Sequence, residues 1–421
     1  MAWEKGTEGA LAPYRVLDLT EGGCALCGKM LADLGADVIK IEVPGGDSGR
    51  STGPFYKNIP DPQKSLFWFA YNGNKRGITL DIAASDGRDI FRRLVKTADF
   101  VIESHPPGYL EALDIGYAAL EKSNPRVIMV SISPFGQEGP YARLRASDLI
   151  TMAMSGFMYL HGDPDRPPVW ITFPQASIAG GAEGAAAALI AHWHRETSGE
   201  GQHIDVSIQE SMTNMLFNAT VWWDISGRNL VRVGDTWQIG PILVPFGYRC
   251  RDGYVSLNLL GGGRPSNVAS SAGIVKWMAE NGMAPPWLQV FDWVNEFDTT
   301  KVTQETVNRI VQAIADFLLT KTKAEVMERA LRDNIIIAPV STAQDIWENP
   351  QYRQRHFFVE VEHPELGASL PYCGPFAKMS RTALQMKRRP PLPGEHNLEI
   401  YEQELKLTRA ELLILKQSQV I

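Results

Sequence analysis

Short apolar runs alternate with helical patterns along the first half of the chain. Two such runs, Tyr14–Thr20 and Asp37–Glu42, have the length and composition of buried strands. Between them, Leu26, Met30 and Leu34 recur at helical spacing, which predicts a helix. A strand, a helix and a second strand in such close succession form a β-α-β unit, whose two strands are parallel.

The same alternation continues as far as residue 208. A helix is expected over Gly87–Thr97, strands over Ala98–Ser104 and Asn124–Ser133, and a short helix over Ser147–Gly156. The stretch Phe173–Ile208 then predicts a loop, a helix rich in small residues, a glycine-rich turn and a strand. Repeated strand–helix alternation favours a Rossmann-like α/β domain with a parallel sheet.

The second half of the chain has a different pattern. A helix rich in Met, Phe and Trp is expected over Ser211–Trp223, and the Asp252-Gly253 turn predicts a hairpin. Helical patterns fill Ile274–Asn334, and strands return from Ile335. We therefore expect a large domain built from residues 1–224 and 335–421, with a smaller α+β domain over residues 225–334.

Composition and charge narrow the class of protein. The chain has 421 residues and a net charge of −7, which argues against a nucleic-acid partner because such proteins need a basic face. No apolar run approaches the ~20 residues that span a bilayer, and the first residues lack the features of a signal peptide. Four cysteines are few, which suits a reducing compartment. We expect a cytoplasmic protein with no membrane association.

Two features suggest metal binding only at first sight. Cys24 and Cys27 form a C-x-x-C, but a zinc site needs two further ligands, and no second close pair exists. The pair lies inside a helical pattern, so we expect packed thiols. His192 and His194 are two residues apart, which puts them on different faces of a helix. No metal site is expected.

Several segments resemble the class III CoA-transferases of the CaiB/BaiF type, and the resemblance covers nearly the whole chain. It is carried by N-x-N-K-R, SISPFGQEGPY, R-x-x-D-L-x-x-x-A-x-S-G, RETSGEGQHIDVS and the closing PPLPGEHNLEIYEQEL, at Asn72–Arg76, Ser131–Tyr141, Arg145–Gly156, Arg195–Ser207 and Pro390–Leu405. The resemblance implies a Rossmann-like large domain plus a smaller domain, in a dimer whose two chains interlock. Without it, Asn72–Arg76 alone would be interpreted as a solvated turn.

The resemblance also implies a reaction that moves CoA between two acids, with CoA thioesters as substrates and no tightly bound cofactor. An aspartate at the start of the small-residue helix attacks the thioester, and the mixed anhydride is then converted to an aspartyl-CoA thioester. Counted back from the turn Ser198–Gln202, that aspartate falls on Ser177. The catalytic histidine of the related racemases would fall on Ser147. Both positions therefore depart from the family's pattern.

No carboxylate lies between Trp170 and Ala182 that could replace the aspartate. Glu183 follows too far along the helix, and Asp163 and Asp165 lie in a proline-rich loop. We expect the chain to lack the family's nucleophile, because a serine hydroxyl needs an activating base and none is near in sequence. A Ser177 activated by a distant residue, or a misaligned carboxylate, remains the alternative.

The resemblance places CoA-binding residues at Gly22, Gly23, Leu80, Ser104 and His105. The basic residues that usually accompany them are replaced: Val43 follows the second strand, and a further basic position falls near Ala112. Phosphates are held best by charge-assisted bonds, so tight CoA binding by this chain is in doubt. A lone histidine in a loop, such as His105, is more often an exposed residue than a ligand contact.

Three functions are consistent with these observations. The first is the nucleophile-less subunit of a heteromeric CoA-transferase, paired with a homologous subunit that carries the aspartate. The resemblance implies succinyl-CoA as donor and an aryl-substituted dicarboxylic acid as acceptor. The second is a homomeric CoA-transferase or isomerase with another nucleophile. The third is a scaffold or regulatory protein on this fold.

Overall fold

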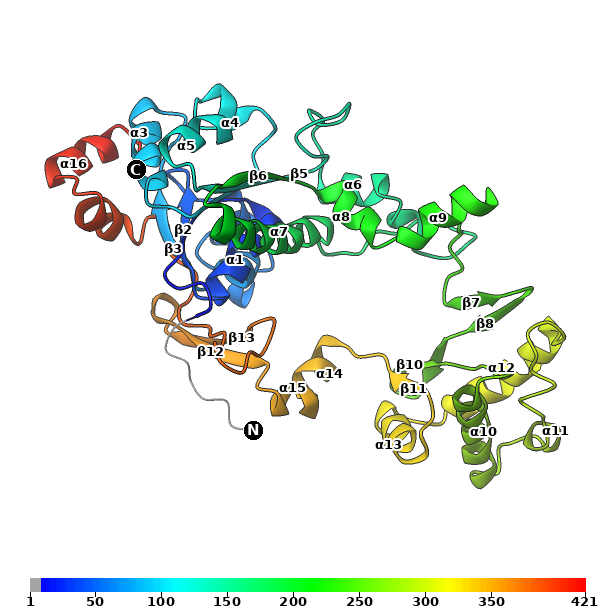
Figure 1. Cartoon of the computed structure of the whole chain (residues 1–421). Coiled ribbons are helices and arrows are strands. Elements are labelled where there is room, and N and C mark those ends of the chain that lie inside the picture. Colours follow the sequence, from blue (N-terminus) through cyan, green and yellow to red (C-terminus); the bar gives the residue numbers. More distant parts are fainter. Residues whose placement is uncertain (1–8) are drawn as a thin grey trace. The chain divides into compact units, whose positions relative to one another are not determined.

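A computed structural model describes residues 9–421 and divides the chain into two compact units (Figure 1). The first unit contains residues 9–158 together with Trp170–Asn229 and Gln351–Ile421. The second contains Tyr159–Val169 and Leu230–Pro350. Each is described by itself below.

The first unit is built on a six-stranded parallel sheet, as the strand–helix alternation predicts. Its strands follow the order β3 (Arg76–Thr79), β2 (Asp37–Glu42), β1 (Arg15–Leu19), β4 (Phe100–Glu103), β5 (Ile128–Ser133) and β6 (Gln202–Ser207). Every residue of β4 and β5 is buried, as expected of central strands covered on both faces. The Rossmann-like fold class is confirmed.

Helices cover both faces of this sheet. Neighbouring residues of a strand point to opposite faces, so each strand places apolar side chains against both layers of helices. Val16, Phe100 and Ile132 pack with the helices of one face, and Leu17, Val101 and Met129 pack with those of the other. The first face carries α1 (Leu26–Asp33), α6 (Asp148–Met154), α7 (Ala176–Ser198) and α8 (Ile208–Asn214). The second carries α3 (Ser85–Val95), α4 (Tyr109–Ala112), α5 (Tyr117–Ser123) and α16 (Arg409–Gln417).

The C-terminal segment completes the second face. A π-helix over Leu398–Glu404 packs with the sheet, and the Tyr401 hydroxyl donates to the carbonyl of Thr79 at 2.6 Å. The N–H of Asp81 donates to the carbonyl of Val420 at 2.8 Å, so the end of the chain lies beside the loop that precedes α3 (Figure 1). The unit also contains the hairpin β12 (Phe358–His363) and β13 (Ala368–Cys373) and the helices α2 (Leu66–Asn72), α9 (Phe217–Ser226) and most of α15 (Pro350–Gln354).

The second unit combines two small antiparallel sheets with helices around one apolar core. Its strands are β7 (Thr236–Ile239), β8 (Ile242–Pro245), β9 (Gly247–Cys250), β10 (Gly253–Leu257) and β11 (Ile337–Pro339). Its helices are α10 (Pro265–Glu280), α11 (Pro286–Gln289), α12 (Gln304–Leu318), α13 (Lys323–Asp333) and α14 (Ala343–Glu348).

Some sequence expectations differ from the structure. Residues 335–350 belong to the second unit, because β11 pairs with β10, whereas the expected return to the large domain began at 335. Tyr159–Val169 also belongs to the second unit, and residues 225–229 belong to the first. The helix expected over Ser211–Trp223 is interrupted between α8 and α9. There Leu216 donates to Thr213 and Ala219 donates to Leu216, so tighter i to i+3 bonds replace the helical ladder without a glycine or proline.

Over residues 9–421, no helix combines the length and apolar character that crossing a membrane requires.

Candidate active site

A carboxylate from a separate helix caps the start of α7. The helix begins after Gln175, whose side chain makes no capping bond. Instead, the carboxylate of Asp148, the first residue of α6, accepts hydrogen bonds from the backbone N–H of Gln175 at 3.1 Å and of Ser177 at 3.0 Å. N–H groups that a helix leaves free at its N-terminus are thus satisfied by an anion, which also suits the positive end of the helix dipole.

The hydroxyl of Ser177 lies between this carboxylate and the glycine turn after β1. Its Oγ is 3.3 Å from Oδ1 of Asp148. On the other side, a Cβ at Gly23 would stand only 2.4 Å from Ser177 Oγ. The turn thus approaches the start of α7 so closely that a side chain at position 23 would force Ser177 to shift.

The sequence-predicted residues Gly22, Gly23, Ser104 and His105 follow β1 and β4, the two strands at which the sheet changes its winding direction. In open α/β sheets, ligands bind at the carboxyl ends of the strands at this point. Here the two loops are joined, because the N–H of Glu21 donates to Ser104 Oγ at 2.8 Å.

Leu80 and His105 line a small cavity, of about 50 Å³, beside the carboxyl ends of β1 to β4. Its charged lining consists of four carboxylates and one ammonium group, from Glu21, Glu42, Asp47, Asp81 and Lys40. Burial, together with the charge of Lys40, lowers the pKa of His105 to about 4, so its imidazole is neutral at pH 7. The cavity thus offers little positive charge to a phosphate.

The buried cations near this cavity are already paired. Lys40 contacts Asp47 at 3.0 Å and also donates to the carbonyl of Thr20. Arg50 binds both oxygens of Glu42, at 2.6 and 2.7 Å. These groups stabilise strand ends, because each would be costly to bury alone.

The N-x-N-K-R segment is a buried ion-pair centre, so its interpretation as a solvated turn is wrong. Lys75 is fully buried and its ammonium donates to Asp18 at 2.7 Å and to Asn72 at 2.9 Å. Arg76 binds Asp37 with two nitrogens, at 2.8 and 2.6 Å. Burial alone would raise the pKa of Asp18, but Lys75 and Lys40 together lower it below its ordinary value.

The comparisons with known proteins agree with this geometry. A family model described as CoA-transferase family III matches residues 11–397. The chain belongs to this family. Subunit BbsE of succinyl-CoA:(R)-benzylsuccinate CoA-transferase from Thauera aromatica is 34% identical over 388 residues, which cover 92% of each chain. Succinate–glutarate CoA-transferase from Agrobacterium fabrum is 32% identical over 378 residues, covering 89% of this chain and 90% of the relative.

Among solved structures, a CaiB/BaiF family protein from Brucella suis is similar with a TM-score of 0.79. The two are 26% identical, and the match covers 94% of this chain and 100% of the other. The family resemblance of the sequence is confirmed, and with it CoA thioesters as the substrates of the family's reaction.

Within this class III fold, Asp148 is the functional candidate that the sequence did not reveal. The residues considered as replacements lie elsewhere: Glu183 accepts a 2.6 Å bond from Ser211 on α8, and Asp163 and Asp165 are exposed in the second unit. The sequence has no base close to Ser177, but in the structure the carboxylate of Asp148 lies within hydrogen-bond distance of the Ser177 hydroxyl. One signal pointed to it: α7 has no capping side chain of its own, so its N–H groups needed an outside acceptor.

A second buried carboxyl group lies at the end of β4. Burial raises the pKa of Glu103 to about 7, although hydrogen bonds from Ser131 and from the N–H of His105, the latter at 2.6 Å, favour its charged form. Ser131 also contacts His203 Nε2 at 2.9 Å, and His203 stacks on Tyr117. A carboxyl group that titrates near neutral pH at the carboxyl end of β4 can exchange a proton there.

The two cysteines of the C-x-x-C are buried free thiols in the core between α1, α7 and the sheet. Burial, followed by the charges of Glu103 and Asp18, raises the pKa of Cys24 to about 12. Burial also raises the pKa of Cys27. Both thiols are therefore protonated and unreactive at neutral pH.

Proposed function

We propose that this chain is the subunit without a catalytic nucleophile in a heteromeric CoA-transferase. The complex moves CoA from succinyl-CoA to an aryl-substituted dicarboxylic acid such as (R)-benzylsuccinate. Similarity to BbsE, a subunit of succinyl-CoA:(R)-benzylsuccinate CoA-transferase, supports this substrate pair. The reaction itself follows from membership of the family.

The observation that carries the proposal is the start of α7. The family's reaction needs a carboxylate that attacks the thioester carbonyl, with free N–H groups nearby to hold the oxyanion. At this position the chain has Ser177, and the N–H groups of Gln175 and Ser177 already donate to Asp148. The start of α7 in this chain thus lacks both the attacking carboxylate and the free N–H donors that the family's reaction needs.

The charge of the predicted CoA site points in the same direction. The cavity at Leu80 and His105 is lined by more carboxylates than cations, and His105 is neutral at pH 7. Phosphate groups need cations free to form charge-assisted bonds. In the proposed complex the homologous partner, which carries the aspartate, binds the CoA thioester.

The surface of α9 supports an obligate partner. Trp222, Trp223 and Ile225 are 52%, 56% and 78% exposed, and Met215 before the helix is 59% exposed. Large apolar side chains grouped in this way mark interaction surfaces. We propose that the two subunits form the interlocked dimer of the class III type, in which such surfaces are buried.

Co-expression with the homologous aspartate-bearing subunit tests the proposal. We expect a stable complex in equal proportions that has transferase activity, and neither chain active alone. In the complex, Ser177→Ala should leave kcat within about threefold of the unaltered complex, because the serine does no chemistry. Full activity of the partner alone would contradict the proposal, as would a loss of more than about a hundredfold in the Ser177→Ala complex.

One observation favours a second candidate, a homomeric transferase that uses Ser177. A nucleophile and its base must lie within hydrogen-bond distance, and Ser177 Oγ lies 3.3 Å from the carboxylate of Asp148. Incubation of the isolated chain with succinyl-CoA, followed by an acid quench that preserves a succinyl ester and by mass spectrometry, separates the two. The heteromeric proposal predicts no modified peptide, whereas the second candidate predicts a modification at Ser177 that Asp148→Asn abolishes.

A further inference from the structure

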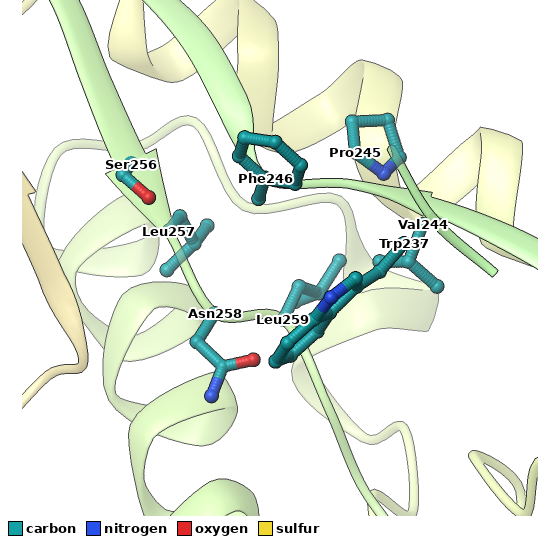
Figure 2. Close-up of a pocket in the computed structure, with 8 residues that line it drawn as sticks. All are labelled: Trp237, Val244, Pro245, Phe246, Ser256, Leu257, Asn258 and Leu259. Carbon is teal, nitrogen blue, oxygen red and sulfur yellow. The ribbon is translucent and has the colours of Figure 1, made fainter. Parts of the chain in front are cut away.

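The second unit contains a pocket of about 370 Å³ between its two small sheets (Figure 2). This volume lies within the usual range of small-molecule sites, which is roughly 300–1,000 Å³. The lining side chains come from β7, β8, β10 and the residues that follow β8 and β10: Trp237, Val244, Pro245, Phe246, Ser256, Leu257, Asn258 and Leu259.

The pocket has an apolar floor and aromatic walls. Val244, Leu257 and Leu259 are almost completely buried, whereas Trp237 and Phe246 keep about half of their surface exposed. An exposed indole and phenyl ring on either side of a buried aliphatic floor provide flat surfaces on which another ring can stack. The shape therefore fits a single aromatic ring.

One buried polar atom in the lining lacks a hydrogen-bond partner among the residues that the structure describes. Asn258 Oδ1 is buried and accepts no hydrogen bond from any residue that the structure describes. In Figure 2 this oxygen points toward the indole of Trp237, which also lines the pocket. A buried amide oxygen left unpaired is unfavourable, so a ligand with an O–H or N–H donor at this point is favoured.

The uncharged lining of the pocket disfavours the charged groups of a substrate. None of its eight residues is ionisable under neutral conditions. A carboxylate or a phosphate would lose its hydration without gaining a counter-charge. A hydrocarbon ring would fill the space but would leave Asn258 Oδ1 unpaired.

From these observations we infer that the pocket binds a hydroxylated aromatic ring, the aryl group of the acid substrate, with the ring hydroxyl donating to Asn258 Oδ1. The assignment of the ring to the acid rests on the proposed function, whereas the preference for a hydroxylated ring rests on the pocket alone. Sites that bond a ligand hydroxyl discriminate strongly against the analogue without it.

Binding of two matched probes tests the pocket directly. 4-Fluorophenol and 4-fluorotoluene have the same ring and differ in the donor, and ¹⁹F NMR gives the dissociation constant of each for the full chain. We expect the phenol to bind at least about tenfold more tightly. Asn258→Leu should abolish this preference, and Trp237→Ala should weaken both probes. Asn214→Leu, the same change at an exposed position of α8 in the first unit, is the matched control and should alter neither.

Equal binding of the two probes, or no binding, would overturn the inference. Tighter binding of adenosine, a flat ring with an N–H donor, would assign the pocket to a nucleotide base and overturn it as well. So would loss of phenol binding when the partner subunit is added, since a partner side chain would then fill the pocket.

The assembled complex tests whether the ring belongs to the acid. We expect kcat/KM to be at least about tenfold higher for 4-hydroxybenzylsuccinate than for benzylsuccinate, and Asn258→Leu should remove the difference. An active complex without this preference would overturn the assignment to the acid. If the phenol binds as expected but no complex transfers CoA, the proposed function fails while the ring-binding pocket stands.

Discussion

Replacing Asp148 should destabilise the start of α7, because this one carboxylate accepts two N–H bonds there and also interacts with the helix dipole. Asp148→Ala removes the acceptor of two backbone N–H bonds, at 3.1 and 3.0 Å, at the head of a 23-residue helix. Loss of a capping acceptor costs about 0.5–2 kcal/mol, and loss of the negative charge at the helix dipole costs about 0.3–1 kcal/mol more. We therefore expect the free energy of unfolding to fall by about 1–3 kcal/mol. Asp148→Asn keeps one acceptor oxygen and should cost less.

Urea unfolding followed by circular dichroism measures this loss. Hydrogen exchange of a peptide covering the first turn of α7 locates it, because the amides of Gln175 and Ser177 should lose protection first. Asp165→Ala, which removes an exposed carboxylate in the second unit, should stay within about 0.5 kcal/mol of the unaltered chain. If Asp148→Ala behaves like this control in both measurements, Asp148 does not cap the helix, and the argument that the donors are occupied fails.

Two further predictions concern buried titrating groups. The pKa of Glu103 is raised to about 7 from an ordinary value of 4.5, so the folded state binds this proton more tightly and stability falls as pH rises between these values. Glu103→Gln should therefore have a higher free energy of unfolding than the unaltered chain at pH 8, by up to about 3 kcal/mol, as measured by urea unfolding. The difference should be smaller at pH 5, and an equal difference at both pH values would refute this. Iodoacetamide at pH 8 should label the exposed Cys373 of the folded chain but not the buried Cys24 and Cys27. All three thiols should react in urea, and rapid labelling of Cys24 in the folded chain would contradict its burial.

The sequence predicted the large parallel sheet well because hydrophobic periodicity is local information. The strand expected over Asp37–Glu42 matches β2, and the residues Leu26 and Met30 that recur at helical spacing lie in α1. The break between α8 and α9 was missed, because no glycine or proline marks it. The pairing of β11 with β10 was also missed, since it joins residues that are far apart in sequence and depends on which sheet edge is open.

The candidate site was only partly predictable for a similar reason. Gly22, Gly23, Ser104 and His105 could be expected to meet, because the carboxyl ends of parallel strands share one edge of a sheet. Lys75 could not be recognised as buried, since its partner Asp18 lies 57 residues away. A charged residue in a polar turn is normally solvated, and only tertiary structure provides the counter-charge that allows burial.

The contact between Asp148 and Ser177, which are 29 residues apart, links the fold to the proposed function. A helix N-terminus can hold a developing oxyanion only through N–H groups that are free when the substrate arrives. In this chain an internal carboxylate occupies those donors, and its negative charge would repel an oxyanion placed beside Ser177. Adding a carboxylate by Ser177→Asp would restore the attacking group but would place two anions at the helix start. The cap that stabilises α7 thus disfavours an oxyanion at this position, and under the proposed function we expect the chemistry to take place at the aspartate of the homologous subunit.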